Sequence, residues 1–247
     1  MIGGLARSPW VNPPAQLSLP FDETHVWLAD LDGDPYESEQ IARFLAPDEH
    51  ELAARVRLQR NRQRWIVARG TLRMLLGRYL DTNPRLIELT YSPQGKPSLV
   101  SPDDVDLRFN LSHADDLALF AFSIGRDLGV DLEHCRPDDQ EMPVAERLFT
   151  LEETAYIATH DGCDRQRAFL RCWTAKDAYL KARGLGLTTA ARNHVRVLRA
   201  DEIIAPRDWV VTQLDPTPDT IGMLAVHGPT RGIQTWYWRS PLQPKYN

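Results

Sequence analysis

The sequence contains little cysteine and no long apolar run. Its three cysteines (Cys135, Cys163 and Cys172) are an odd number among 247 residues and form no C-x-x-C pair. This excludes a disulfide framework and a zinc site built on paired cysteines. No apolar run approaches the roughly 18 residues that a membrane span requires, and the first residues lack the apolar segment of a secretory signal. We therefore expect a soluble protein of the cytoplasm.

The sequence also lacks a strong excess of either charge. Its 29 basic and 34 acidic residues give a net charge of −5, which provides no general attraction for nucleic acid or for an anionic membrane. Any anion site must therefore be a local group of lysines and arginines. Apolar residues make up 43% of the chain, enough for a core, and the length fits one large domain or two of ordinary size, at about 100–200 residues each.

The order of predicted elements is strand, helices, strands, and the second half repeats it in outline. We expect residues 1–24 to form a flexible arm, residues 25–123 a first subdomain and residues 124–247 a second. Periodicity and end signals predict helices at Glu37–Leu45, from Pro47, at Arg60–Tyr79, at Leu151–Ala158 and at Arg165–Arg183, the last capped by Asp164 and stopped by Gly184. Strands are predicted at His25–Leu31, Leu86–Tyr91, Leu107–Leu111, 117–123 and 129–136, then as a meander at Val195–Leu198, Trp209–Leu214, Ile221–Val226 and Ile233–Trp238.

The most informative strand reads Gly129-Val-Asp-Leu-Glu133. Because side chains alternate along a strand, Asp131 and Glu133 share one face. Two neighbouring carboxylates are stabilised by a cation, and their hard oxygens suit Mg²⁺. The alternative is an edge strand with a solvated acidic face.

The second informative segment is the helix that contains Trp173, Asp177 and Lys181, which are spaced four apart and share one stripe. The alternative is an ordinary surface pair of Asp177 with Lys181. A third segment, Phe109-Asn-Leu-Ser-His113, ends a strand with two hydrogen-bonding side chains suited to an anion; a capping serine and a surface histidine are the alternative. Upstream, Gln94-Gly-Lys-Pro97 presents Lys96 on a turn.

Taken together, these segments resemble the motifs of the long, surfactin-type class of 4′-phosphopantetheinyl transferases. The motifs are Gly95-Lys-Pro97, Phe109-Asn-Leu-Ser-His113, Gly129-Val-Asp-Leu-Glu133, and Trp173-Thr-Ala-Lys-Asp-Ala-Tyr-Leu-Lys181 followed by Gly184-Leu-Gly-Leu187. The resemblance spans roughly residues 37–190. It implies an α/β (α+β) fold of two similar subdomains in pseudo-two-fold arrangement, each a small, mainly antiparallel sheet packed on a long helix, with coenzyme A bound between them.

The resemblance also implies an activity and its residues. The enzyme would transfer the 4′-phosphopantetheine arm of coenzyme A to a serine of an apo acyl or peptidyl carrier protein and release 3′,5′-ADP. Asp131, Glu133 and Asp177 would hold Mg²⁺, and Lys181 would neutralise a phosphate. The residues implied to contact the phosphate and nucleotide end are Lys96, Ser112 and His113, with Arg69 and then Arg64 as candidates for the 3′-phosphate.

One position departs from the family pattern, which usually has Glu where this chain has Asp177. The shorter side chain loses about 1.5 Å of reach, and Mg²⁺ tolerates little distortion of its octahedron. We therefore expect either that Asp177 acts through a bridging water or that its helix lies closer to the strand.

Two other functions are compatible with parts of the sequence. A metal-dependent nuclease would use a strand D…E-x-K pattern, but no lysine stands two residues after Glu133. A degenerate homologue would bind coenzyme A or a carrier protein without transfer. If transfer does occur, we expect the carrier to dock around Pro137–Phe149, with Arg136 and Arg147 facing its acidic helices, and we expect a monomer because two halves already supply both walls of the cleft.

Overall fold

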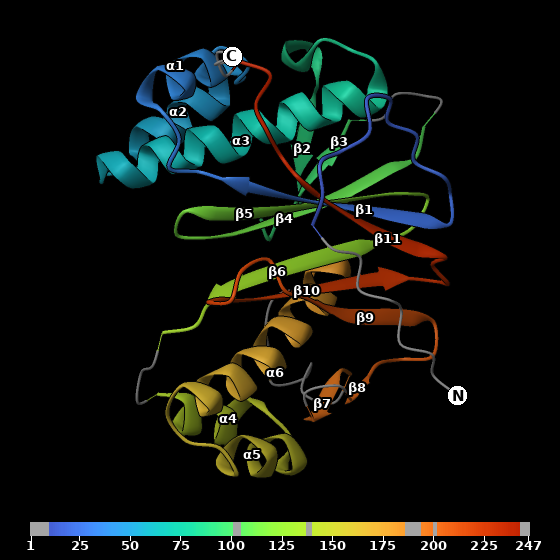
Figure 1. Cartoon of the computed structure of the whole chain (residues 1–247). Helices are drawn as coiled ribbons and strands as arrows, with labels where there is room; N and C mark the ends of the chain where they lie inside the picture. Colours follow the sequence, from blue (N-terminus) through green and yellow to red (C-terminus); the bar gives the residue numbers. More distant parts are fainter. Residues whose placement is uncertain (1–9, 101–104, 137–139, 186–193, 200–201, 243–247) are drawn as a thin grey trace.

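The computed structural model describes residues 10–100, 105–136, 140–185, 194–199 and 202–242. Two long helices lie on the outer faces of two sheets, giving the layer order helix, sheet, sheet, helix (Figure 1). This arrangement confirms the predicted fold class of two small sheets, each packed on a long helix.

The first half is built on α3 (Gln59–Leu80) and a four-stranded sheet. The sheet has the order β11-β1-β5-β4, formed by β11 (Gly232–Tyr237), β1 (Glu23–Asp30), β5 (Leu117–Ile124) and β4 (Leu107–Ala114). Strand β5 is antiparallel to both β1 and β4. Its remaining elements are α1 (Pro35–Ala42), α2 (Pro47–Arg55), the 3-10 turn η1 (Pro84–Leu86) and the hairpin of β2 (Leu89–Tyr91) with β3 (Pro97–Leu99). The apolar stripe of α3 packs with side chains of the sheet in one buried cluster, as its helical periodicity predicts.

The second half is built on α6 (Gly162–Ala182) and the antiparallel sheet β6-β10-β9, formed by β6 (Leu128–His134), β10 (Thr220–His227) and β9 (Trp209–Leu214). Helices α4 (Glu141–Leu148) and α5 (Leu151–Ala158) and the hairpin of β7 (Arg196–Arg199) with β8 (Glu202–Ile204) complete it. The predicted capping box is confirmed, because Thr150 and Glu153 cap each other's backbone at the start of α5. Gly184 follows α6 at φ +64°, the left-handed conformation expected of a residue that ends a helix.

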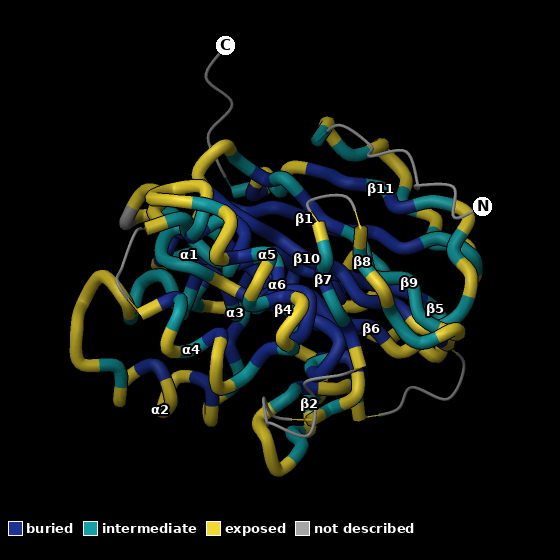
Figure 2. Tube along the Cα trace, turned by 90° about the horizontal axis from the view of Figure 1, so that it is seen from below, coloured by how far each residue is buried: buried dark blue, intermediate teal, exposed yellow. Residues whose placement is uncertain are grey.

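The inner faces of the two sheets pack against each other. Val26 and Leu119 of the first sheet meet Val130 and Leu224 of the second in one buried cluster. The central strands are accordingly the most deeply buried parts of the chain (Figure 2). The end of β6 therefore lies beside the end of β4, and this contact positions the site described below.

Three sequence predictions need correction. Helix α6 begins at Gly162 after Asp161, so Asp164 lies in its first turn and does not cap it. Only Leu89–Tyr91 of the strand predicted from residue 86 forms a strand, because Pro84 starts a 3-10 turn that occupies residues 84–86. The last predicted strand leaves the second-half meander: β11 (Gly232–Tyr237) pairs in parallel with β1 and forms the edge of the first sheet.

The described part of the N-terminal segment is attached to that same strand. The backbone N–H of Val11 donates to the Thr235 carbonyl at 3.2 Å, and Tyr237 N–H donates to the Val11 carbonyl at 3.0 Å. Residues 10–22 therefore run along the body of the protein, in contrast to the flexible arm expected there. Residues 1–9 of the predicted arm lie outside the described residues.

Candidate active site

Strand β6 carries two acidic residues on the face that α6 covers. Its alternate residues enter the core between the sheets, so Gly129, Asp131 and Glu133 share the opposite face, as the alternation predicts. Gly129 allows α6 to lie directly on the strand, since a Cβ at this position would stand only 2.1 Å from the Ala178 carbonyl oxygen. This close approach sets the polar residues of α6 beside the carboxylates of β6.

Asp131 and three other side chains, which come from three elements in all, form one cluster. Oδ1 of Asp131 accepts hydrogen bonds from the Lys181 ammonium at 2.6 Å and from the Ser112 hydroxyl at 2.9 Å. The same ammonium lies 3.0 Å from Oδ2 of Asp177 and donates to Ser112 Oγ at 3.1 Å. The motifs on β4, β6 and α6 therefore converge on one cluster. The pair of Asp177 with Lys181 is present and partly exposed, and Lys181 also contacts Asp131.

The cluster holds more negative than positive charge. Burial, together with the carboxylates of Asp177 and Glu133, raises the pKa of Asp131 to about 7 against the opposing effect of Lys181. Burial also raises the pKa of Glu133, and Asp177 adds to that rise. Burial alone would lower the pKa of Lys181, but Asp131 and Asp177 outweigh it and raise the pKa of the ammonium. Three acidic groups around one ammonium leave a negative potential that a further cation would relieve.

Within the described parts of the chain, no three His, Cys, Asp or Glu side chains converge closely enough to hold a metal ion. The cation in contact with Asp131 and Asp177 is Lys181 itself. The second carboxylate oxygen of Asp131, Oδ2, is buried and has no hydrogen-bond partner. A buried carboxylate oxygen without a partner is a donor of the kind that suits a hard divalent cation, so the chemistry of Asp131 fits the predicted metal.

Sequence comparisons identify the family. A model of the 4′-phosphopantetheinyl transferase superfamily matches residues 127–225, and a model of the 4′-phosphopantetheinyl transferase N-terminal region matches residues 33–124. The chain is 32% identical over 232 residues to the 4′-phosphopantetheinyl transferase HetI of Nostoc sp., covering 93% of this chain and 97% of HetI. The chain belongs to the 4′-phosphopantetheinyl transferase superfamily. It is also 26% identical over 152 residues to Sfp of Bacillus subtilis (62% of this chain, 66% of Sfp) and 37% identical over 112 residues to AcpT of Salmonella typhimurium (45% of this chain, 56% of AcpT).

In this phosphopantetheinyl transferase, the predicted anion ligands on β4 point in two directions. Ser112 is buried within the carboxylate cluster, while the next residue, His113, is exposed on the opposite side of the strand. The pKa of His113 is lowered, first because neighbouring atoms desolvate part of its ring although the residue reaches solvent, and then by the positive charges of Lys181 and Arg69. His113 therefore faces a basic environment open to an anion, whereas Ser112 holds Asp131 in place.

Lys96 has a different setting from the one its motif predicts. Its ammonium donates to the carbonyl oxygens of Leu128, Lys181 and Ala182 at 3.2, 2.7 and 3.2 Å. These contacts use all three donors of a lysine and tie the β2–β3 turn to the last turn of α6. Burial lowers the pKa of Lys96. In this arrangement Lys96 is a structural link, and its contact with the phosphate end stays a prediction.

The two candidate arginines on α3 are placed differently. Arg69 lies between the rings of Trp65 and Tyr91, at 5.4 and 5.6 Å from their centroids, and its Nη1 is buried without a hydrogen-bond partner. Arg64 makes a two-point contact with Asp32 at 2.6 and 2.7 Å and lies 3.7 Å from Asp115. Each arginine has a carboxylate nearby, since Arg69 Nε lies 3.6 Å from Glu49, which also pairs with Arg73. Arg69 is nevertheless the better placed of the two for a phosphate, because its Nη1 has no partner while Arg64 is held at two points.

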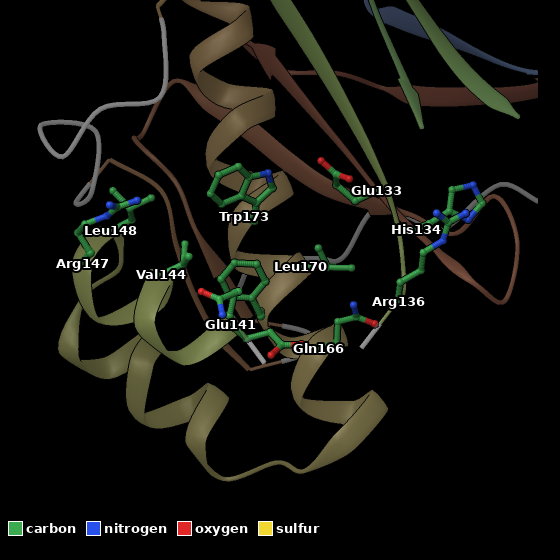
Figure 3. Close-up of a pocket in the computed structure, with 12 residues that line it drawn as sticks. Glu133, His134, Arg136, Glu141, Val144, Arg147, Leu148, Gln166, Leu170 and Trp173 are labelled. Carbon is green, nitrogen blue, oxygen red and sulfur yellow. The ribbon is translucent and has the colours of Figure 1, made fainter. Parts of the chain in front are cut away.

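A pocket of about 370 Å³ opens between α4 and α6 beside Glu133. Figure 3 shows Glu133 and Trp173 at one end of its lining and Gln166 with Glu141 at the other. The pocket is lined by Glu133, His134, Arg136, Gln140, Glu141, Val144, Arg147, Leu148, Gln166, Phe169, Leu170 and Trp173. The segment expected to face the carrier therefore forms one wall of a cavity next to the carboxylate cluster.

Three residues of the site region were not singled out by the sequence. Asn110 accepts a hydrogen bond from the Val130 N–H at 2.8 Å and links β4 to β6; the alternation that pairs Asp131 with Glu133 would also have paired Asn110 with Ser112. Lys176 forms a buried ion pair with Glu153 at 2.9 Å and fixes α6 to α5. Gln166 lies in the pocket, and no local pattern distinguishes it.

Proposed function

We propose that this enzyme transfers the 4′-phosphopantetheine moiety of coenzyme A to a serine of an apo carrier protein and releases 3′,5′-ADP. The observation that carries the proposal is the cluster of Asp131, Asp177, Lys181 and Ser112, which unites three of the four family motifs where the two halves meet. Family membership and the relatives named 4′-phosphopantetheinyl transferase support the same reaction.

The carboxylates would hold the metal. Asp131, Glu133 and Asp177 are the proposed ligands of Mg²⁺, and the buried, unpartnered Oδ2 of Asp131 supports this role. When bound, Mg²⁺ would neutralise charge on the pyrophosphate that is attacked. The Lys181 ammonium, released from Asp131, would neutralise a phosphate oxygen. Contact of α6 with the backbone of β6 at Gly129 supports the expectation that a close helix offsets the short side chain of Asp177.

Glu133 is the proposed general base. It is half-buried at the mouth of the pocket, and its raised pKa makes its carboxylate a stronger acceptor for the proton of the attacking serine hydroxyl. Asp131 is fully enclosed and already accepts two hydrogen bonds on Oδ1, so it serves better as a ligand than as a base.

The basic side chains on the other side of β4 would take the nucleotide end of coenzyme A. His113 lies in the positive field of Lys181 and Arg69, and we propose Arg69 for the 3′-phosphate. Three other side chains are weaker candidates for contact with the phosphate and nucleotide end: Arg64, Lys96 and Ser112. Each already uses its polar atoms in hydrogen bonds to the protein.

The pocket beside Glu133 would take the pantetheine arm, and the carrier would dock above it on α4. Arg136 and Arg147 line the pocket and are exposed, which suits the acidic helices of a carrier. Residues 137–139 of the proposed docking segment lie outside the described residues.

We also propose a monomer of the cytoplasm. The two halves supply both walls of the cleft, and the three cysteines are free thiols. None of the described helices is long and apolar enough to span a membrane.

The test is a direct transfer assay. The protein is incubated with coenzyme A, Mg²⁺ and a panel of apo carrier proteins, and the carrier mass is measured. We expect a mass increase by one phosphopantetheine on the acceptor serine, dependent on Mg²⁺ and absent with Asp131→Ala, which should remain folded. Binding of coenzyme A with no mass increase on any carrier would favour a homologue that binds without transfer, and activity retained by Asp131→Ala in Mg²⁺ would overturn the metal assignment.

A further inference from the structure

The inner end of the pocket holds a buried glutamine whose amide oxygen has no hydrogen-bond partner. Gln166 on α6 is 5% exposed, and its Oε1 is buried and makes no hydrogen bond. Other buried polar side chains of α6 have partners: Thr174 donates to the Leu170 carbonyl at 2.7 Å, and Lys176 is paired with Glu153. Buried polar groups are normally hydrogen-bonded, so an unpartnered one that lines a cavity indicates that a ligand supplies the bond.

We infer that Gln166 binds a secondary amide of the pantetheine arm, an inference that rests on the proposed function. A secondary amide has one N–H donor and one carbonyl acceptor, and the side chain of Gln166 offers the matching acceptor and donors. The terminal torsion of a glutamine is broad, so rotation about it brings either Oε1 or Nε2 to the pocket. The pantetheine arm is a narrow chain with two secondary amides separated by methylene groups.

The position of Gln166 fits this role. Glu133 and Gln166 lie at opposite ends of the pocket lining (Figure 3). A chain attached to a phosphoryl group held at Glu133 would therefore run inward toward Gln166. Along the way it would pass Trp173 and Phe169, whose rings suit the methyl and methylene groups of the arm. The cavity of about 370 Å³ lies within the range of small-molecule pockets.

Charge argues against a free anion as the ligand of this inner end. Glu141 lines the pocket on the same side as Gln166 and is buried. An uncharged amide of the arm is compatible with a neighbouring carboxylate, whereas a phosphate is repelled by it. Gln166 is thereby a specificity residue for the arm, and the phosphates bind at the other end.

The experiment compares two ligands that differ in the arm. Gln166→Leu and Gln166→Met remove the amide but keep a side chain of similar length, and the dissociation constants of coenzyme A and of 3′,5′-ADP, which lacks the arm, are measured by calorimetry. We expect both variants to bind coenzyme A roughly 5- to 100-fold more weakly, because the arm's amide is left unpaired. Binding of 3′,5′-ADP should be unchanged, and the melting temperature of the free variants should be unchanged or higher, because a buried unpartnered group has been removed.

Gln59→Leu is the matched control, since Gln59 is an exposed glutamine at the start of α3 and does not line the pocket. This variant should bind both ligands as the wild type does. Wild-type affinity of the Gln166 variants for coenzyme A, equal losses for both ligands, or a loss confined to the KM of the carrier would each overturn the inference. Transfer by the wild type is measured separately from the carrier mass. A failure of the proposed function is therefore distinguished from a failure of Gln166 to bind the pantetheine arm.

Discussion

Replacing Asp131 by asparagine should stabilise the protein while removing its activity. Burial raises the pKa of this carboxyl from 3.8 to about 7 even with Lys181 in contact. The folded protein therefore holds the proton more tightly than the unfolded chain does. As pH rises from about 4 to 7, the unfolded chain releases this proton first, and the stability that the protonated group contributes is lost. Asparagine has the same shape and does not ionise, so the variant escapes this loss.

The size of the effect follows from the shift. Three pKa units correspond to about 4 kcal/mol, which is an upper limit, because the variant weakens the contact of Lys181 with this side chain. We expect Asp131→Asn to be more stable than the wild type by between about 1 and 4 kcal/mol at pH 8 and equal to it near pH 4. Transfer should be lost, because one carboxylate of the proposed metal site is gone.

Urea unfolding in EDTA at pH 4, 6 and 8 measures this difference without interference from metal binding. Asp127→Asn is the control, because Asp127 is an exposed carboxylate one residue before β6, and its variant should follow the wild-type pH profile. The reasoning is refuted if Asp131→Asn is less stable than the wild type at pH 8, since the ionised carboxylate would then be a net stabilising group.

Three further changes test other parts of the site region. Lys176→Met should lower the free energy of unfolding, measured in urea, by about 3–5 kcal/mol, because it leaves Glu153 buried without its ion-pair partner. Adding Glu153→Gln should restore part of the loss. A Lys176→Met variant near wild-type stability would contradict this. Gly129→Ala should lower both the melting temperature and transfer, because the new Cβ collides with the α6 backbone, and wild-type values for both would contradict the close packing. Lys181→Met should abolish transfer yet raise the affinity of the free protein for Mn²⁺ about tenfold or more, measured by electron paramagnetic resonance, because a unit charge a few Å from the ion is removed. Arg183→Met removes a positive charge that no carboxylate among the described residues contacts, so it should show no such rise.

The local chemistry of the site was predictable from periodicity. Alternation placed Asp131 and Glu133 on one strand face, and helical spacing placed Asp177 beside Lys181. Both patterns are set by the backbone within a few residues, so they survive folding unchanged. The long helix α3 was found for the same reason.

Contacts between residues that are distant along the chain could not be predicted from the sequence. Lys96 is held by the Lys181 carbonyl 85 residues away, and Arg64 by Asp32, 32 residues before it. Whether a basic side chain is free for a ligand depends on such contacts, which no local pattern encodes. Gln166 was missed for a related reason. It stands out only because its buried Oε1 has no hydrogen-bond partner in the fold, and no sequence pattern shows this.

The parallel pairing of β11 with β1 has a consequence for how the molecule unfolds. Residues 232–237 follow the second sheet in the chain, yet they complete the first sheet. A fragment made of the first half alone would expose the edge of β1 and would tend to associate with other chains. Loss of the second half also removes the strand that closes the first, so we expect the two halves to melt in one cooperative transition, and two separate calorimetric transitions would contradict this.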